Sequence, residues 1–136
     1  MNLEYAILVG GLLHFGILIA SALVPQVLDW RKSLATLDPL SRQLIWVHGA
    51  FIVLVIIALG LLASVFPGEL AAGTPLARGL CLFIGGFWGA RLAVQFFVFD
   101  AKPFLRNFWL KFGYHTLTVV FLYHTAVFGY AAFAPR

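Results

Sequence analysis

The chain has 136 residues, of which 62% are hydrophobic and 10% are charged, and its formal net charge is +4. A soluble domain carries about 25% charged residues, so these polar side chains are too few to cover a water-facing globule. The basic residues lie mostly at the ends of apolar stretches and form no single patch, which is typical of membrane topology and argues against a nucleic-acid partner.

The first two predicted elements are apolar stretches at residues 3–24 and 44–66. Each has about 20 or more residues, enough for a helix to cross a hydrocarbon core of about 30 Å. Pro25 follows the first stretch and Pro67 follows the second. No charged region of a signal peptide precedes the first stretch, so we expect it to remain in the mature protein.

Two further spans are predicted at residues 76–99 and 108–133. The segment "DAKPF" follows the third span, and "RNFWLK" opens the fourth. Tryptophans near span ends favour the membrane interface, and three of them lie there: Trp30, Trp46 and Trp109. We therefore predict an all-α integral membrane protein in which residues 1–136 form one four-helix transmembrane bundle.

Loop charges predict the orientation of the bundle. The loops after the first and third spans carry most of the basic residues, namely Arg31, Lys32, Arg42, Lys102, Arg106 and Lys111. The second loop carries only Arg78. By the positive-inside rule, the first and third loops face the cytoplasm and both termini face the outer, periplasmic side.

All the histidines of the chain, His14, His48, His115 and His124, fall inside predicted spans. A polar side chain in lipid is costly and usually faces a partner, a cavity or a cofactor. From the outer ends of their spans, His14 lies about 17 Å deep and His124 about 14 Å deep, at about 1.5 Å per helical residue. From the cytoplasmic ends, His48 lies about 6 to 9 Å deep and His115 about 10 Å deep. These depths predict the pairs His14/His124 and His48/His115.

The two histidines of the fourth span point to opposite helix faces and lie about 13.5 Å apart along the axis. They cannot ligate one metal together, which indicates two separate sites. Porphyrin iron takes axial histidines, and an apolar bundle suits the flat macrocycle. A bare zinc or copper site is disfavoured, because no carboxylate or second cysteine lies within a span. An intrachain disulfide is excluded, because Cys81 is the single cysteine of the sequence.

Arg91 is a second unusual residue, about 12 Å from the cytoplasmic end of the third span. Its expected partners are backbone carbonyls, a lipid phosphate reached by snorkelling, or an anionic group of a ligand. Gln95, one turn further on, shares its face. Small residues near mid-membrane predict close helix approach: Gly10, Gly11, Gly85, Gly86 and Gly89.

The histidines lie in "GLLHFGIL" of the first span, in "WVHGAF" of the second and twice in the fourth. This arrangement resembles the small diheme b-type cytochromes of bacterial inner membranes, which are four-helix, quinol-linked electron carriers. The resemblance implies that His14, His48, His115 and His124 ligate one or two b haems. It also implies a place in the bacterial inner membrane. If the chain is such a haem-binding subunit, we expect Arg91 and Gln95 to anchor a propionate or a quinone. The step from His115 to His124 is shorter than that family uses, and the predicted orientation differs.

Three functions follow as hypotheses. The first is the haem-binding subunit for quinone-linked electron transfer. The second is an accessory subunit of a membrane complex or a homo-oligomer, in which the histidines are interhelical hydrogen-bond partners. The third is a membrane enzyme or small transporter for a lipid-like substrate, with Arg91 holding an anionic head group. The sequence leaves open whether the protein is an enzyme.

Overall fold

The computed structural model describes residues 2–98 and 108–134, and within these ranges the regular structure is entirely helical. Four helices are long and apolar enough to cross a membrane: α1 (Leu3–Val27), α3 (Pro39–Val65), α5 (Pro75–Phe97) and α6 (Phe108–Phe133). Two short helices, α2 (Trp30–Ser33) and α4 (Pro67–Ala71), lie in the first and second connections. The four predicted spans are thus confirmed as helices. Lys102 and Arg106, two of the basic residues from which the orientation was predicted, lie outside the described residues.

Three of the long helices begin at side-chain caps. Asn2 accepts a hydrogen bond from the backbone N–H of Tyr5, at 3.1 Å, and opens α1. Asp38 and Thr74 cap α3 and α5 in the same way and are each followed by proline, which suits the first helical turn because its missing N–H has no partner there anyway. With Asp38 as its cap, α3 begins at Pro39, five residues before residue 44, where the second span was predicted to start.

The first helix also extends past its predicted end. Pro25 lies inside α1, which continues to Val27. A proline in the last turn removes one backbone donor but does not force the chain to stop there at once. The helix ends where Asp29 takes a left-handed conformation, with φ 50°.

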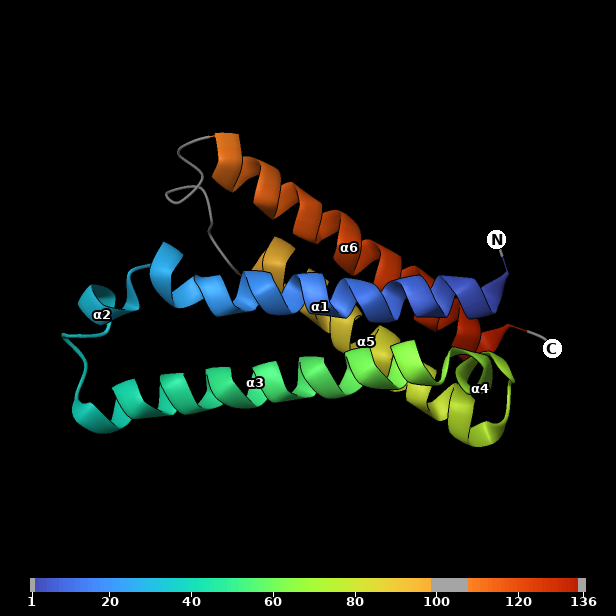
Figure 1. Ribbon diagram of the computed structural model, residues 1–136. Coiled ribbons are helices and arrows are strands. Elements are labelled where there is room, and N and C mark those ends of the chain that lie inside the picture. Colours follow the sequence, from blue (N-terminus) through green and yellow to red (C-terminus); the bar gives the residue numbers. More distant parts are fainter. Residues whose placement is uncertain (1, 99–107, 135–136) are drawn as a thin grey trace.

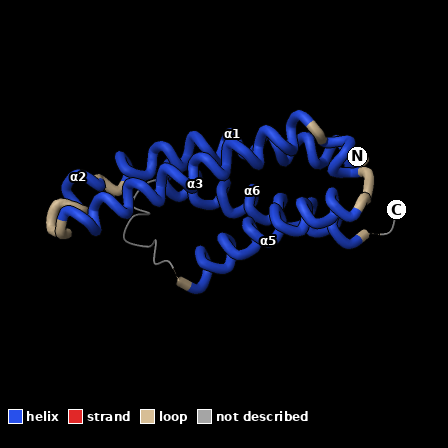
Figure 2. The backbone as a smooth tube through the Cα atoms, turned by 90° about the horizontal axis from the view of Figure 1, so that it is seen from below, coloured by secondary structure: helices blue, strands red, loops and turns tan. Residues whose placement is uncertain are grey.

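The long helices form two antiparallel hairpins, α1 with α3 and α5 with α6 (Figure 1). The start of α1 and the end of α6 lie at the same end of the molecule, beside α4, and Figure 2 shows the same relation from below. Toward the other end, where α2 lies, α6 diverges from α1 and α3 (Figure 1). The bundle therefore has a closed half near α4 and an open half near α2.

Glycine contacts hold the closed half together. A Cβ added at Gly11 of α1 would lie 2.7 Å from the backbone nitrogen of Ser64 in α3. A Cβ at Gly85 of α5 would lie 3.0 Å from the backbone nitrogen of Gly129 in α6. Only glycine, whose side chain is a hydrogen atom, lets two helix backbones approach this closely. The predicted small-residue contacts are therefore present at these two crossings.

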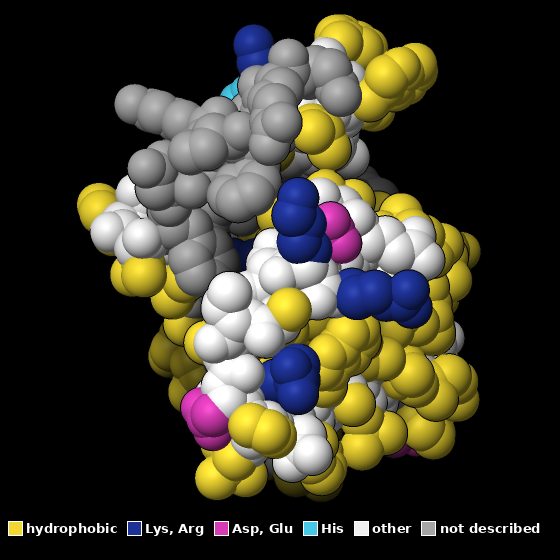
Figure 3. All heavy atoms as spheres, turned by 90° about the vertical axis from the view of Figure 1, so that its left-hand side faces the viewer, with side chains coloured by type: hydrophobic (Ala, Val, Ile, Leu, Met, Phe, Trp, Pro, Cys, Tyr) yellow, Lys and Arg dark blue, Asp and Glu magenta, His cyan; other side chains and the backbone are white. Residues whose placement is uncertain are grey.

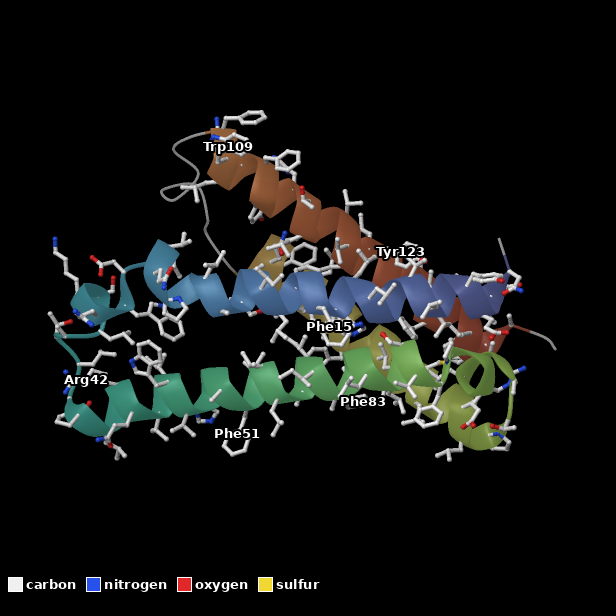
Figure 4. All side chains as sticks on the ribbon, viewed as in Figure 1. Phe15, Arg42, Phe51, Phe83, Trp109 and Tyr123 are labelled. Carbon is white, nitrogen blue, oxygen red and sulfur yellow. The ribbon has the colours of Figure 1, made fainter. Side chains whose placement is uncertain are left out.

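Large apolar side chains cover much of the outer surface. Phe51, for example, is 62% exposed on α3 and points away from the bundle (Figure 4). Figure 3 looks onto the end that carries α2 and shows Lys and Arg side chains gathered there. We call this end the basic end. Its described Lys and Arg residues are Arg31, Lys32, Arg42 and Lys111. An apolar surface with charged ends matches four membrane-crossing helices.

Candidate functional site

His14 of α1 and His124 of α6 meet in the closed half. Both side chains are fully buried, with 0% exposure, and their ring centroids lie 4.3 Å apart in an edge-to-face arrangement. The structure thus brings together the two histidines that their depths placed at one level. A Cβ at Gly10 would lie 2.9 Å from the Phe128 ring, so this glycine lets Phe128 of α6 pack closely against α1 beside the pair.

A third side chain, Trp88 of α5, completes a buried polar cluster with this pair. Its indole Nε1 donates to Nε2 of His14 over 2.8 Å. Because Nε2 accepts this bond, the proton of the neutral His14 ring lies on Nδ1, which donates to the Gly10 carbonyl over 2.7 Å. Nε2 of His124 lies 2.8 Å from the same carbonyl. The cluster thereby links α1, α5 and α6.

The second nitrogen of His124 also faces a carbonyl, that of Val120, at 2.9 Å. A neutral imidazole carries one N–H and donates to only one of its two carbonyl neighbours at a time. Tyr123, the preceding residue, donates its hydroxyl to the Ala6 carbonyl over 2.8 Å and joins α6 to α1 again. Each of the two histidines therefore has one hydrogen-bond contact to another helix and one to a carbonyl of its own helix.

This arrangement does not fit a haem held between His14 and His124. Axial ligation requires one nitrogen of each ring to point at a common iron from opposite faces of the macrocycle, with metal–nitrogen bonds of about 2 Å. Here the two rings touch edge to face, and both Nε2 atoms already face Trp88 or Gly10. Within residues 2–98 and 108–134, no group of three or more His, Cys, Asp or Glu side chains is placed to hold a metal ion.

The second predicted pair is not brought together. His48 is exposed on α3, and its Nδ1 bonds to the Leu44 carbonyl of its own helix, at 2.7 Å. His115 is exposed on α6, with its ring against that of Tyr114. They lie in the open half, where α6 diverges from α3 (Figure 1). Equal depth along two helices therefore did not make these residues neighbours.

Gln95 and Arg91, the other predicted site residues, take different roles. Gln95 is buried and donates a hydrogen bond to the Thr118 hydroxyl, which joins α5 to α6. Arg91 lies one turn deeper, with its guanidinium carbon 5.4 Å from the centroid of the Phe121 ring. At this distance the cation is attracted by the face of the aromatic ring.

Arg91 forms part of the wall of a cavity in the open half. This hairpin cavity has a volume of about 380 Å³ and is bordered by residues of all four long helices, among them Ile17, Ile56, Trp88, Arg91, Leu117 and Phe121. Ligand pockets in proteins are mostly apolar, hold a few polar groups and measure about 300–1,000 Å³. The hairpin cavity matches this description in size and in lining.

Trp88 is a site residue that the sequence reasoning missed. Its ring both lines the hairpin cavity and bonds to His14 in the polar cluster. The sequence did carry a signal, because Trp88 lies in the middle of a predicted span, away from the interface that tryptophan favours. A buried indole N–H usually needs an acceptor, and His14 provides one.

Comparisons of the chain with protein-family models, with curated proteins and with solved structures found no match.

Proposed function

We propose that this chain is an integral membrane protein that binds a membrane-soluble amphiphile between its two helical hairpins. The observation that carries the proposal is the hairpin cavity, which all four long helices border and in whose wall Arg91 lies. Its apolar lining suits an alkyl or prenyl chain, and its polar side chains, Ser21, Trp88 and Arg91 among the described lining residues, suit one small head group.

The charge distribution supports a direction for this binding. Arg31, Lys32, Arg42 and Lys111 lie at the end of the bundle toward which the open half faces. By the positive-inside rule this end is cytoplasmic, and both termini are then on the outer side. We propose the bacterial inner membrane as the location, with the hairpin cavity in its cytoplasmic leaflet.

The haem-binding electron carrier stays a prediction. It requires His14 and His124 to exchange their bonds to Trp88 and Gly10 for iron, and His48 and His115 to approach each other. The accessory-subunit hypothesis has one supporting observation, since His14 and His124 make the interhelical hydrogen bonds that it expects. Such a structural role is compatible with an amphiphile in the open half.

The proposal is tested by native mass spectrometry of the full chain, purified in mild detergent from membranes. Ala90 and Ala93, three residues further along α5, are both exposed, but only Ala90 is among the described residues that line the hairpin cavity. We expect a co-purifying amphiphile that Ala90→Phe removes and Ala93→Phe retains. Equal retention in both variants, with both folded, would contradict binding in the cavity.

A further inference from the structure

The hairpin cavity has a closed inner end, which we call the cavity floor. Each of the four long helices contributes one buried side chain to this floor, at most 3% exposed. The four residues are Ile17 of α1, Ile56 of α3, Trp88 of α5 and Phe121 of α6. The Trp88 and Phe121 rings stack with their centroids 5.2 Å apart, and through Trp88 the floor adjoins the polar cluster.

One helical turn nearer the basic end, each long helix adds a second lining residue, which is half-buried or exposed. These cavity-rim residues are Ser21, Ile52, Arg91 and Leu117. Each lies three or four residues from the floor residue of its own helix, which corresponds to about 5–6 Å along the axis. The cavity therefore closes toward the middle of the bundle and opens toward the basic end, where α6 diverges (Figure 1).

The side chains of the floor offer an occupant no hydrogen bond. Three of them are purely apolar, and the single donor of the fourth, the indole N–H of Trp88, is given to His14. A polar group placed on the floor would lose its hydrogen bonds to water without replacing them, which costs free energy. The other polar side chains among the described lining residues, Ser21 and Arg91, belong to the rim. The floor therefore suits the apolar end of an amphiphile, and the rim suits its polar end.

We infer that the occupant is a single-chain amphiphile that inserts chain-first, with the last carbon of its chain against the floor and its head group toward the basic end. This inference rests on the proposed function and assigns the ligand class and its direction in the same cavity.

The depth of the floor agrees with this direction. Trp88 lies nine residues before Phe97, the last residue of α5, which corresponds to about 14 Å from that end of the helix. Half of a hydrocarbon core measures about 15 Å. The floor is therefore near the midplane of the bilayer, where the chains of each leaflet end. A chain-first occupant thus keeps the orientation of a lipid in the adjoining leaflet.

The volume of the cavity limits the occupant to one chain. At about 30 Å³ for a water-sized group, a cavity of about 380 Å³ holds about a dozen non-hydrogen atoms. A dodecyl chain fills this space, whereas the two chains of a phospholipid need more.

Two alcohols test the direction on the unmodified full chain: dodecanol, and the dodecane diol with a second hydroxyl on the last carbon. Chain-first insertion places that second hydroxyl on the floor without a hydrogen bond. We therefore expect the diol to bind at least about fivefold more weakly than dodecanol, measured by native mass spectrometry in one detergent. Equal binding of the two alcohols would overturn the inference.

Fluorescence quenching locates the chain end directly, because bromine quenches an indole that it contacts. Trp30→Phe, Trp46→Phe and Trp109→Phe together leave Trp88 as the single tryptophan, and none of the three replaced residues is among the described lining residues. In nanodiscs we expect saturable loss of most Trp88 emission with dodecanol brominated at its last carbon. Dodecanol brominated at its second carbon is expected to leave most of the emission, and the reverse order would contradict chain-first insertion.

A filled floor provides the matched variant. Ile56→Phe enlarges a floor side chain and is expected to abolish quenching by the chain-end bromine. Leu54→Phe is the control, since Leu54 is 58% exposed on the same helix and is not among the described lining residues. Equal quenching in the two variants would count against the floor. The two alcohols are compared on the unmodified chain, so a poorly folded variant leaves that test intact.

The remaining outcomes separate the inference from the proposed function. If both bromine positions quench Trp88 equally, and Ala90→Phe prevents both, the cavity binds amphiphiles but the chain-first direction is wrong. If dodecanol does not bind, or if Ala90→Phe leaves its binding unchanged, the proposed function itself fails, and the inference with it.

Discussion

The indole N–H of Trp88 lies 2.8 Å from Nε2 of His14, and this bond crosses from the α5–α6 hairpin to the α1–α3 hairpin. The same indole ring stacks on Phe121 and borders the hairpin cavity. Trp88 therefore lies at the junction of the closed and open halves. Because one face of this ring belongs to the cavity, the polar cluster also determines the shape of the proposed binding site.

Replacing this indole tests the cluster directly. Trp88→Phe keeps an aromatic ring but removes the donor, and Nε2 of His14 is then a buried acceptor without its partner. We expect a loss of about 1–3 kcal/mol in the free energy of unfolding, measured by equilibrium unfolding in mixed micelles. Trp109→Phe is the matched control, since Trp109 is 75% exposed at the start of α6 (Figure 4). Similar losses in the two variants would contradict the role of the bond.

The sequence predicts the spans well because their length and hydropathy are properties of single segments. It also places His14 and His124 at one level, since depth along a helix follows from the rise per residue. Depth does not determine how helices tilt or which way a side chain points around the axis. The pair His48/His115 shows this limit, because α6 diverges from α3 toward the end of the bundle where α2 lies (Figure 1).

The glycine crossing of α1 and α3 gives a second prediction. Gly11→Ala places a methyl group 2.7 Å from the backbone nitrogen of Ser64, which a rigid helix cannot avoid. We expect this variant to lower the midpoint of thermal unfolding in detergent, because the two helices must separate. Gly16→Ala in the same helix meets nothing within 4 Å. We expect Gly16→Ala to be neutral or stabilising, by up to about 1 kcal/mol, and the opposite order of the two variants would refute the packing.

The cap of α3 gives a prediction about pH. Hydrogen bonds from Ser41, first of its side chain and then of its backbone, lower the pKa of Asp38 from its ordinary value of 3.8. A carboxyl whose folded pKa is lowered stabilises the helix above the unfolded pKa and loses this effect as pH falls through the folded pKa. We expect protection of the Ser41 amide from hydrogen exchange to stay constant near neutral pH and to decrease below about pH 4. Asp38→Asn keeps a capping oxygen without titrating, so an equal decrease in that variant would argue against the cap.

The visible absorption spectrum shows whether His14 and His124 are hydrogen-bonded within the protein or ligate a haem iron. In the structure both Nε2 atoms of the buried pair face protein partners, Trp88 for His14 and the Gly10 carbonyl for His124. We therefore expect protein purified after expression with ample haem to show no sharpened α band on dithionite reduction that depends on this pair. His124→Ala should instead lower the free energy of unfolding, since it removes the contact with Gly10 and leaves a cavity beside Phe128.

A reduced α band that His124→Ala abolishes in folded protein would overturn this arrangement and restore the cytochrome hypothesis. The matched variant His115→Ala, at an exposed position of the same helix, separates a specific loss from a general effect of removing a histidine.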